Sequence, residues 1–126
     1  MHNKKYLKLN DIEACRIAFK LNNYVWELVI KWDYFAKDTV GKQFVKAVDL
    51  ISANIAEGFG RYSKKDKINF FKYSLGSLYE SLDWNEKSHI RNLLNEEDYG
   101  YIFSELFKLH KSINSLILFT NRKLSL

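Results

Sequence analysis

Apolar residues recur at alternating steps of four and three along most of the chain, and this spacing limits the folds open to it. The first such run holds Ala14, Ala18, Leu21, Val25, Leu28, Trp32 and Phe35. Residues at these steps share one face of an α-helix, which can pack against neighbouring helices. The sequence contains no proline, so long helices can run without interruption. The pattern predicts an all-α protein.

Four helices are expected, over approximately residues 11–36, 41–59, 64–92 and 96–122. Gly58 and Gly60 disfavour helix and should end the second one. Residues suited to cap a helix stand before the first, third and fourth, at Asn10, Ser63 and Asn95. Because the connections are short, successive helices must run antiparallel. We therefore expect one domain over residues 1–126, a single antiparallel up-down-up-down four-helix bundle.

Charge, the start of the chain and the cysteine content limit the classes of function. There are 20 Lys and Arg against 15 Asp and Glu, a net charge of +5, and this modest basic excess attracts polyanions. The first residues lack the apolar core of a signal peptide, and no apolar run approaches the roughly 20 residues of a membrane span. Cys15 is the single cysteine, which excludes an intrachain disulfide and a cysteine-based zinc site. We expect a cytoplasmic protein with no membrane partner.

Polar residues border the apolar faces of the second and third helices. The expected core seam of the third helix is Phe71, Leu75, Leu78 and Leu82, with Ser74, Ser77 and Ser81 beside it. We expect a satisfied polar network that fixes helix register, made of Asn54, Glu57, Ser77 and Glu80. In the alternative, Glu57 and Glu80 share a pocket and act as a hydrolase or nuclease, with or without a metal. That alternative requires two exposed carboxylates within a few ångströms of each other.

The usual signatures of metal and nucleophilic catalysis are incomplete. Glu86 and His89 form one Glu-x-x-His step, whereas a di-iron bundle needs two such pairs and two further glutamates. The stretch Gly58-Phe59-Gly60 lacks the Gly-Lys-Ser/Thr ending of a phosphate loop, and Cys15 has no partner set for nucleophilic chemistry. We expect a non-enzymatic protein with no metal and no cofactor.

A basic cluster occupies the predicted turn between the second and third helices. Its members are Arg61, Lys64, Lys65 and Lys67, with Phe59 and Tyr62 interleaved. This composition suits phosphate contacts with some stacking on aromatic rings. A further basic arm is expected at Lys4, Lys5 and Lys8. The alternative is a solvated loop whose lysines keep the protein soluble.

Two segments on successive predicted helices resemble a known signature. They are Asn54-Ile55-Ala56-Glu57-Gly58 and Gly76-Ser77-Leu78 with Glu80, accompanied by Gln43, Lys46, Ala47, Ile51, Arg61 and Phe70. They are similar to four-helix-bundle proteins first noticed as open reading frames in intervening sequences of bacterial 23S rRNA genes. The resemblance implies a small cytoplasmic bacterial bundle that assembles into a homopentameric ring and has no known catalytic activity. It extends to the accessory variability protein of diversity-generating retroelements, a basic pentameric barrel that binds a reverse transcriptase and nucleic acid.

Two hypotheses for function remain beside the hydrolase. In the first, a non-enzymatic oligomer holds RNA or DNA, or a nucleic-acid enzyme such as a reverse transcriptase, through the basic cluster. In the second, the chain is a purely structural ring with a protein partner, and its widest exposed patch is apolar. The broad apolar arc of the first helix, widened by Phe19 and Trp26, favours a contact between subunits in either case.

Overall fold

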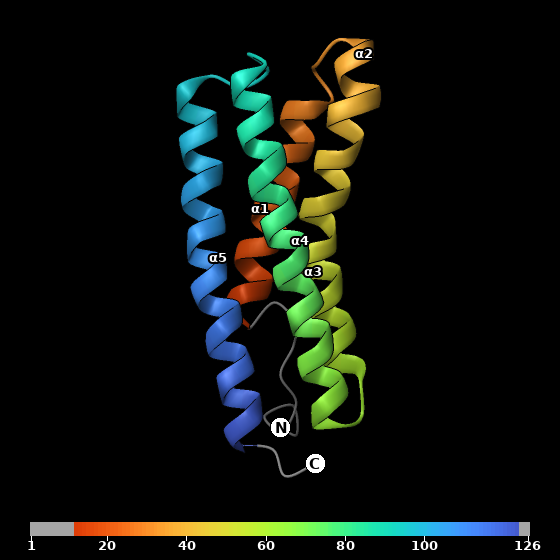
Figure 1. Cartoon of the computed structure of the whole chain (residues 1–126), viewed down its shortest axis with the longest axis vertical. Coiled ribbons are helices and arrows are strands. Elements are labelled where there is room, and N and C mark those ends of the chain that lie inside the picture. Colours follow the sequence, from red (N-terminus) through yellow and green to blue (C-terminus); the bar gives the residue numbers. More distant parts are fainter. Residues whose placement is uncertain (1–11, 124–126) are drawn as a thin grey trace, which may run out of the picture.

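The computed structural model describes residues 12–123, and these residues form helices joined by short turns, with no strand among them. In chain order the elements are α1 (Glu13–Val29), α2 (Tyr34–Ala36), the π-helical turn η3 (Lys37–Gly41), α3 (Lys42–Gly60), α4 (Lys64–Ile90) and α5 (Glu96–Lys123). Because α2, η3 and α3 follow one another without a break, the described chain has four long helices. Figure 1 shows each of them antiparallel to the next. The predicted four-helix bundle is confirmed.

The packing order of the helices gives the bundle four sides. Helix α1 packs against α3 and α5, and α4 packs against the same two helices. The sides are therefore α1/α3, α3/α4, α4/α5 and α5/α1, so the α1/α3 side lies opposite the α4/α5 side (Figure 1). This arrangement decides which exposed residues share a surface.

The apolar face of each helix turns inward, as the spacing predicts, but α4 differs from the other three. Beside Phe71 and Leu78, its inward row holds five buried polar residues: Ser74, Ser77, Ser81, Asn85 and Ser88. Leu75 and Leu82, expected in the core seam, are only half-buried. The expected seam is thus correct for Phe71 and Leu78 and wrong for the other two, because the packing of α3 and α5 rotates the serine row toward the core.

Hydrogen bonds satisfy part of this buried polar row. The Ser74 hydroxyl donates to the Ile51 carbonyl at 2.7 Å, and the Ser81 hydroxyl donates to the Ser77 carbonyl at 2.8 Å. The Asn85 amide donates to the Tyr99 carbonyl at 3.2 Å. The Asn85 Oδ1 and Ser88 Oγ atoms have no hydrogen-bond partner among the described residues. The row thus bonds α4 once to α3 and once to α5, and it leaves two buried polar atoms near the C-terminus of α4 without a described partner.

The break between the first two long helices comes earlier than the sequence predicts. Helix α1 ends at Val29 rather than near residue 36, and the next helix starts at Tyr34 instead of near Gly41. The carboxylate of Asp33 accepts a hydrogen bond from the Ala36 amide at 3.0 Å, so Asp33 caps the new helix. A Cβ atom on Gly41 would lie 2.6 Å from Val29 Cγ1, so the close approach of these helices depends on that glycine.

The remaining helix ends follow the expected residues closely. Helix α3 ends at Gly60, and Ser63 caps α4 by accepting from the Asp66 amide at 3.1 Å. Asn95 accepts from the Asp98 amide at 2.7 Å, as the predicted cap requires. The proposed cap Asn10 and the basic arm at Lys4, Lys5 and Lys8 lie outside the described residues. Over the described range, none of the helices combines the length and the hydropathy that a membrane crossing requires.

Candidate nucleic-acid interface

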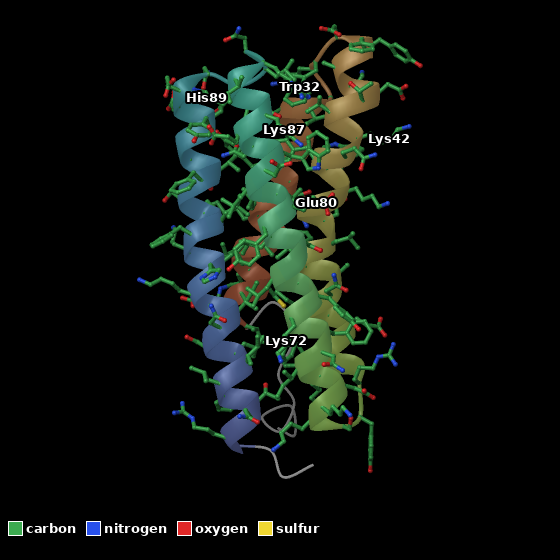
Figure 2. All side chains as sticks on the ribbon, in the orientation of Figure 1. Trp32, Lys42, Lys72, Glu80, Lys87 and His89 are labelled. Atoms are coloured by element: carbon green, nitrogen blue, oxygen red, sulfur yellow. The ribbon has the colours of Figure 1, made fainter. Side chains whose placement is uncertain are left out.

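The predicted basic cluster lies at the end of the bundle that holds the α3–α4 turn. The last turns of α5 lie beside it, because the Lys64 ammonium donates to the Asn121 carbonyl at 3.4 Å. We call this region the basic end and define it by six residues: Arg61, Lys64, Lys65, Lys67, Lys72 and Arg122. Figure 2 labels Lys72 on this part of α4, with Glu80 and Lys87 farther from the turn.

Arg61 is held against the α3/α4 side by two contacts. Its Nη2 lies 2.8 Å from Glu57 Oε2, and both side chains are about half exposed. Its guanidinium carbon also lies 4.5 Å from the ring centroid of Phe70. An exposed ion pair of this kind contributes at most about 1 kcal/mol, but it partly offsets the charge that Arg61 presents to a polyanion.

Lys64 and Lys67 both cap the ends of neighbouring helices. The Lys67 ammonium donates to the Phe59 carbonyl in the last turn of α3 at 3.1 Å. The bond from Lys64 to Asn121 does the same for α5. Cations are favoured at helix C-termini, where carbonyl groups lack a partner within the helix. These two lysines therefore stabilise the basic end as well as charging it, whereas Lys65 is exposed and has no hydrogen bond or ion pair with another described residue.

A groove between α4 and α5 gathers three of the lysines. Its polar lining is Lys64, Lys65, Asn69, Lys72 and Asn121, and its apolar lining is Ile68 and Ile117. The sequence interpretation missed Lys72, although the signal was present. Lys72 comes seven positions after Lys65, which places the two side chains only about 20° apart around the helix axis.

The two aromatic residues interleaved with the cluster take different places. Phe59 is half-buried, and its ring centroid lies 5.4 Å from that of Phe71 in the core. Tyr62 is 88% exposed in the turn between α3 and α4. Tyr62 is thus the aromatic side chain that the turn presents to solvent.

The four residues of the expected polar network make separate contacts and do not bond to one another. Glu57 pairs with Arg61, and Glu80 accepts from the Trp84 indole at 3.4 Å. Ser77 is buried and its carbonyl accepts a hydrogen bond from the Ser81 hydroxyl, while Asn54 is half-buried. No hydrogen bond joins any two of these four side chains in the part of the chain that the structure describes. The buried polar contacts lie instead along the inward row of α4.

The antiparallel register of α3 and α4 separates the two glutamates of the hydrolase alternative. Ser74 lies opposite Ile51, so Glu57 lies at the level of about residue 68 of α4. Glu80 is about twelve residues farther along, which at 1.5 Å per residue is about 18 Å. Both carboxylates are exposed, but one chain does not bring them into a shared pocket.

Glu86 and His89 serve the α4–α5 connection. His89 Nε2 lies 2.7 Å from Glu96 Oε2, and its ring stacks on Tyr99 with centroids 4.0 Å apart. The Tyr99 hydroxyl donates to Glu86 at 2.6 Å. Within residues 12–123 no three His, Cys, Asp or Glu side chains are grouped so that they could hold a metal ion. The Glu-x-x-His step therefore fastens two helix ends together.

Comparison with known proteins identifies the family. Residues 10–115 match the family model described as 23S rRNA-intervening sequence protein. The fold is similar to the crystal structure of a protein of unknown function from the S23 ribosomal protein family of Bacteroides thetaiotaomicron, with a TM-score of 0.74 and 21% sequence identity. That similarity covers 82% of this chain and 97% of the other. No functionally curated protein matches the sequence. Since the family match spans most of the chain, this protein belongs to the family of 23S rRNA-intervening sequence proteins.

Proposed function

We propose that this chain is a non-enzymatic nucleic-acid-binding protein of the bacterial cytoplasm, and that its basic end contacts the phosphates. The observation that carries the proposal is the groove lined by Lys64, Lys65 and Lys72. A protein that neutralises phosphates with lysine releases condensed counterions, and this release drives binding. The two asparagine amides of the groove can add hydrogen bonds to sugar or base atoms.

The charge at the opposite end of the bundle supports this choice of surface. There Lys42 pairs with Asp38 at 3.4 Å, and Lys87 pairs with Asp83 at 2.7 Å. Three acidic residues, Glu96, Glu97 and Asp98, also open α5 at that end. The basic excess of the chain is therefore concentrated at the basic end, and a polyanion is steered there.

Binding of short RNA and DNA across a salt series tests the proposal. We expect the affinity of the natural protein to fall steeply with salt. Replacing Lys65 and Lys72 by glutamine should lower the slope of log affinity against log salt by about 1.4 to 1.8, or 0.7 to 0.9 for each lost contact. The matched control replaces Lys31 and Lys37, which lie at the opposite end, and should keep the slope.

Two outcomes would count against the proposal. An unchanged slope in the Lys65 and Lys72 variant would reject the groove as the binding surface. Absence of binding at low salt would reject the function, and a structural ring with a protein partner, such as a reverse-transcriptase-like enzyme, would then be the better hypothesis.

We also propose that the protein works as a ring of identical copies. Two groups of exposed apolar side chains lie on opposite sides of the bundle. On the α1/α3 side they are Phe19, Trp26 and Ile30, and on the α4/α5 side they are Tyr79, Phe103, Phe107 and Leu118. A two-fold dimer buries one patch against its own copy, whereas two different patches favour head-to-tail contacts that close into a ring. The number five comes from the resemblance of the sequence to pentameric relatives.

Two glycines on outward helix surfaces favour such a contact. A Cβ atom on Gly76 or on Gly100 would meet no atom within 4 Å, so packing within the chain requires neither glycine. Glycine inside a helix costs about 1 kcal/mol relative to alanine. At an outward position it allows another backbone to approach closely. Light scattering tests the assembly: we expect several subunit masses for the natural protein and a smaller mass for Phe107→Glu, and a single subunit mass at all concentrations would reject the ring.

A further inference from the structure

We infer that the basic end takes single-stranded rather than duplex nucleic acid, with an unstacked base on the ring of Tyr62 and phosphates on Lys65 and Lys72. This inference rests on the proposed function and names the class of ligand for the same site. It follows from how the α3–α4 turn presents its aromatic residue and from where the lysines lie relative to it.

The side chain of Tyr62 is exposed to solvent, and hydrogen bonds hold the backbone on both sides of it. The side chain is 88% exposed, the largest exposure among the large apolar side chains of the described residues. On one side, the Arg61 amide donates to the Gly58 carbonyl at 3.2 Å. On the other, Ser63 caps α4 through the Asp66 amide at 3.1 Å. The ring is therefore displayed from a fixed position, which lowers the ordering cost of stacking a ligand on it.

A flat ring in solvent suits a single strand and not a duplex. In a duplex the faces of the bases are covered by their neighbours, so a protein reaches phosphates, sugars and base edges. In a single strand each base can offer a free face, and stacking on aromatic side chains is the usual source of affinity beside charge. Tyr62 has no described ring partner within its own chain, so its face is open to a base.

The groove lysines Lys65 and Lys72 lie on α4, the helix that begins two residues after Tyr62. Lys65 lies in the first turn of α4, three residues after Tyr62, and Lys72 lies on the same face about 10 Å farther along the helix axis. Ile68 and Ile117 give the groove between them an apolar floor, and Asn69 and Asn121 add amides. In the arrangement that we infer, a strand with one base on the Tyr62 ring lies along α4 and meets a phosphate contact at Lys65, groups that suit bases and sugars, and a second phosphate contact at Lys72.

The chain supplies a matched control at the other end of the bundle. Tyr34 is also highly exposed, at 76%, and it begins the helix that follows α1. Its neighbour Asp33 is acidic, and Asp38 lies one turn later. Lys31 and Lys37 lie three residues to either side of Tyr34, so positive and negative charges balance around it. An exposed tyrosine without a net positive charge around it should contribute little to the binding of a polyanion.

The experiment compares a short labelled RNA as a single strand and as a blunt duplex by fluorescence anisotropy at low salt. We expect the natural protein to bind the single strand more tightly. Tyr62→Ala should weaken single-strand binding by about 5- to 150-fold and leave duplex binding unchanged, because the loss is that of one stacked base. Tyr62→Phe should retain most of the affinity, since it keeps the ring. Tyr34→Ala should bind as the natural protein does.

The outcomes separate this inference from the function on which it rests. Equal or tighter binding of the duplex, with no effect of Tyr62→Ala on either form, would overturn the single-strand inference and leave a phosphate-binding basic end in place. A natural protein that binds neither form at low salt would overturn both.

Discussion

The two ends of the bundle differ in where they place their polar groups. At the basic end the Phe59 and Phe71 rings pack together in the interior, where Thr120 is also buried, while Lys65 and Lys72 stand in solvent or in the groove. The far end comprises residues 30–42 and 83–99. Its interior holds Asn85 and Ser88, and the ammonium of Lys42 is paired with Asp38. The basic end thus combines packed aromatic rings with a local excess of positive charge, and the far end combines two buried polar atoms that lack a described partner with a mixture of both charge signs.

This difference suggests a division of tasks within one small domain. A binding surface that exposes like charges loses stability through their repulsion, so it benefits from a well-packed apolar interior beneath it. The far end mixes basic and acidic side chains, among them the three acidic residues that open α5, and its polar contacts serve to fasten the helix connections. Each of the following predictions tests one element of that contrast.

The largest effect is expected from removing the apolar interior of the basic end. Phe71 is completely buried, and a Cβ atom on Gly58 would lie 2.6 Å from its ring. Phe71→Ala should lower the free energy of unfolding by about 3 to 5 kcal/mol, because it leaves a cavity. Urea unfolding at one fixed protein concentration measures this. Phe35→Ala, at a 76% exposed position, is the control and should cost little. Equal losses in both variants would contradict the proposed interior of the basic end.

The next effect concerns a polar contact at the far end. The Tyr24 hydroxyl donates to Asp98 at 2.5 Å, and burial together with this carboxylate raises the pKa of Tyr24 above its usual value. Tyr24→Phe should cost about 1 to 2 kcal/mol near neutral pH, where the bond to a charged acceptor is intact.

The pH dependence of this contact has a definite sign. A raised pKa in the folded state means that the contact's contribution is complete below the usual tyrosine pKa of about 10 and is lost as the pH rises through the higher folded value. The difference in unfolding free energy between the natural protein and Tyr24→Phe should therefore shrink in strongly alkaline solution. A difference that stays constant up to that range would show that Tyr24 acts through packing alone.

The sequence predicted the architecture because helical spacing and the absence of proline leave few alternatives. The predictions from sequence were wrong where the same residues fitted two different structural interpretations. Trp32 and Phe35 continue the apolar spacing of α1, and this obscured the cap at Asp33 that starts a new helix. On α4, Leu75 and Ser74 lie about 100° apart around the helix, and residue type favoured the leucine for the core. The neighbouring helices decide that rotation, and a sequence does not contain their positions.

The site was predictable to a similar degree. The turn, its basic cluster and its exposed tyrosine follow from local sequence, and the pair Glu57–Arg61 could have been inferred from its spacing of four residues. The bonds from Lys64 to Asn121 and from Lys67 to Phe59 depend on tertiary packing. Local sequence therefore locates the basic end, and only the fold separates the capping lysines from the exposed one.

A smaller change in stability should distinguish the residues of the polar row on α4 that have a hydrogen-bond partner from those that lack one. Ser74→Ala removes a buried bond and leaves the Ile51 carbonyl without that donor, so it should cost about 1 kcal/mol. Ser88→Ala removes a buried hydroxyl that has no described partner, so it should be neutral or slightly stabilising. Thermal unfolding of the two variants, compared at equal concentration, measures the contrast. A larger loss for Ser88→Ala would mean that its hydroxyl bonds to a buried water, and the far end would then be as well satisfied as the rest of α4.

The smallest change in stability is expected for Glu57→Gln, because the Glu57–Arg61 pair is half exposed. We expect a loss of no more than about 0.5 kcal/mol. The same substitution releases Arg61 from its partner, so it should raise affinity for RNA at low salt and steepen the salt slope by about 0.7, the value of one further phosphate contact on a single strand. Asp83→Asn, which frees Lys87 toward the far end, is the matched control and should leave the slope unchanged. A slope that rises equally in both variants would mean that the polyanion senses only the net charge of the bundle, and the contrast between its two ends would then have no part in binding.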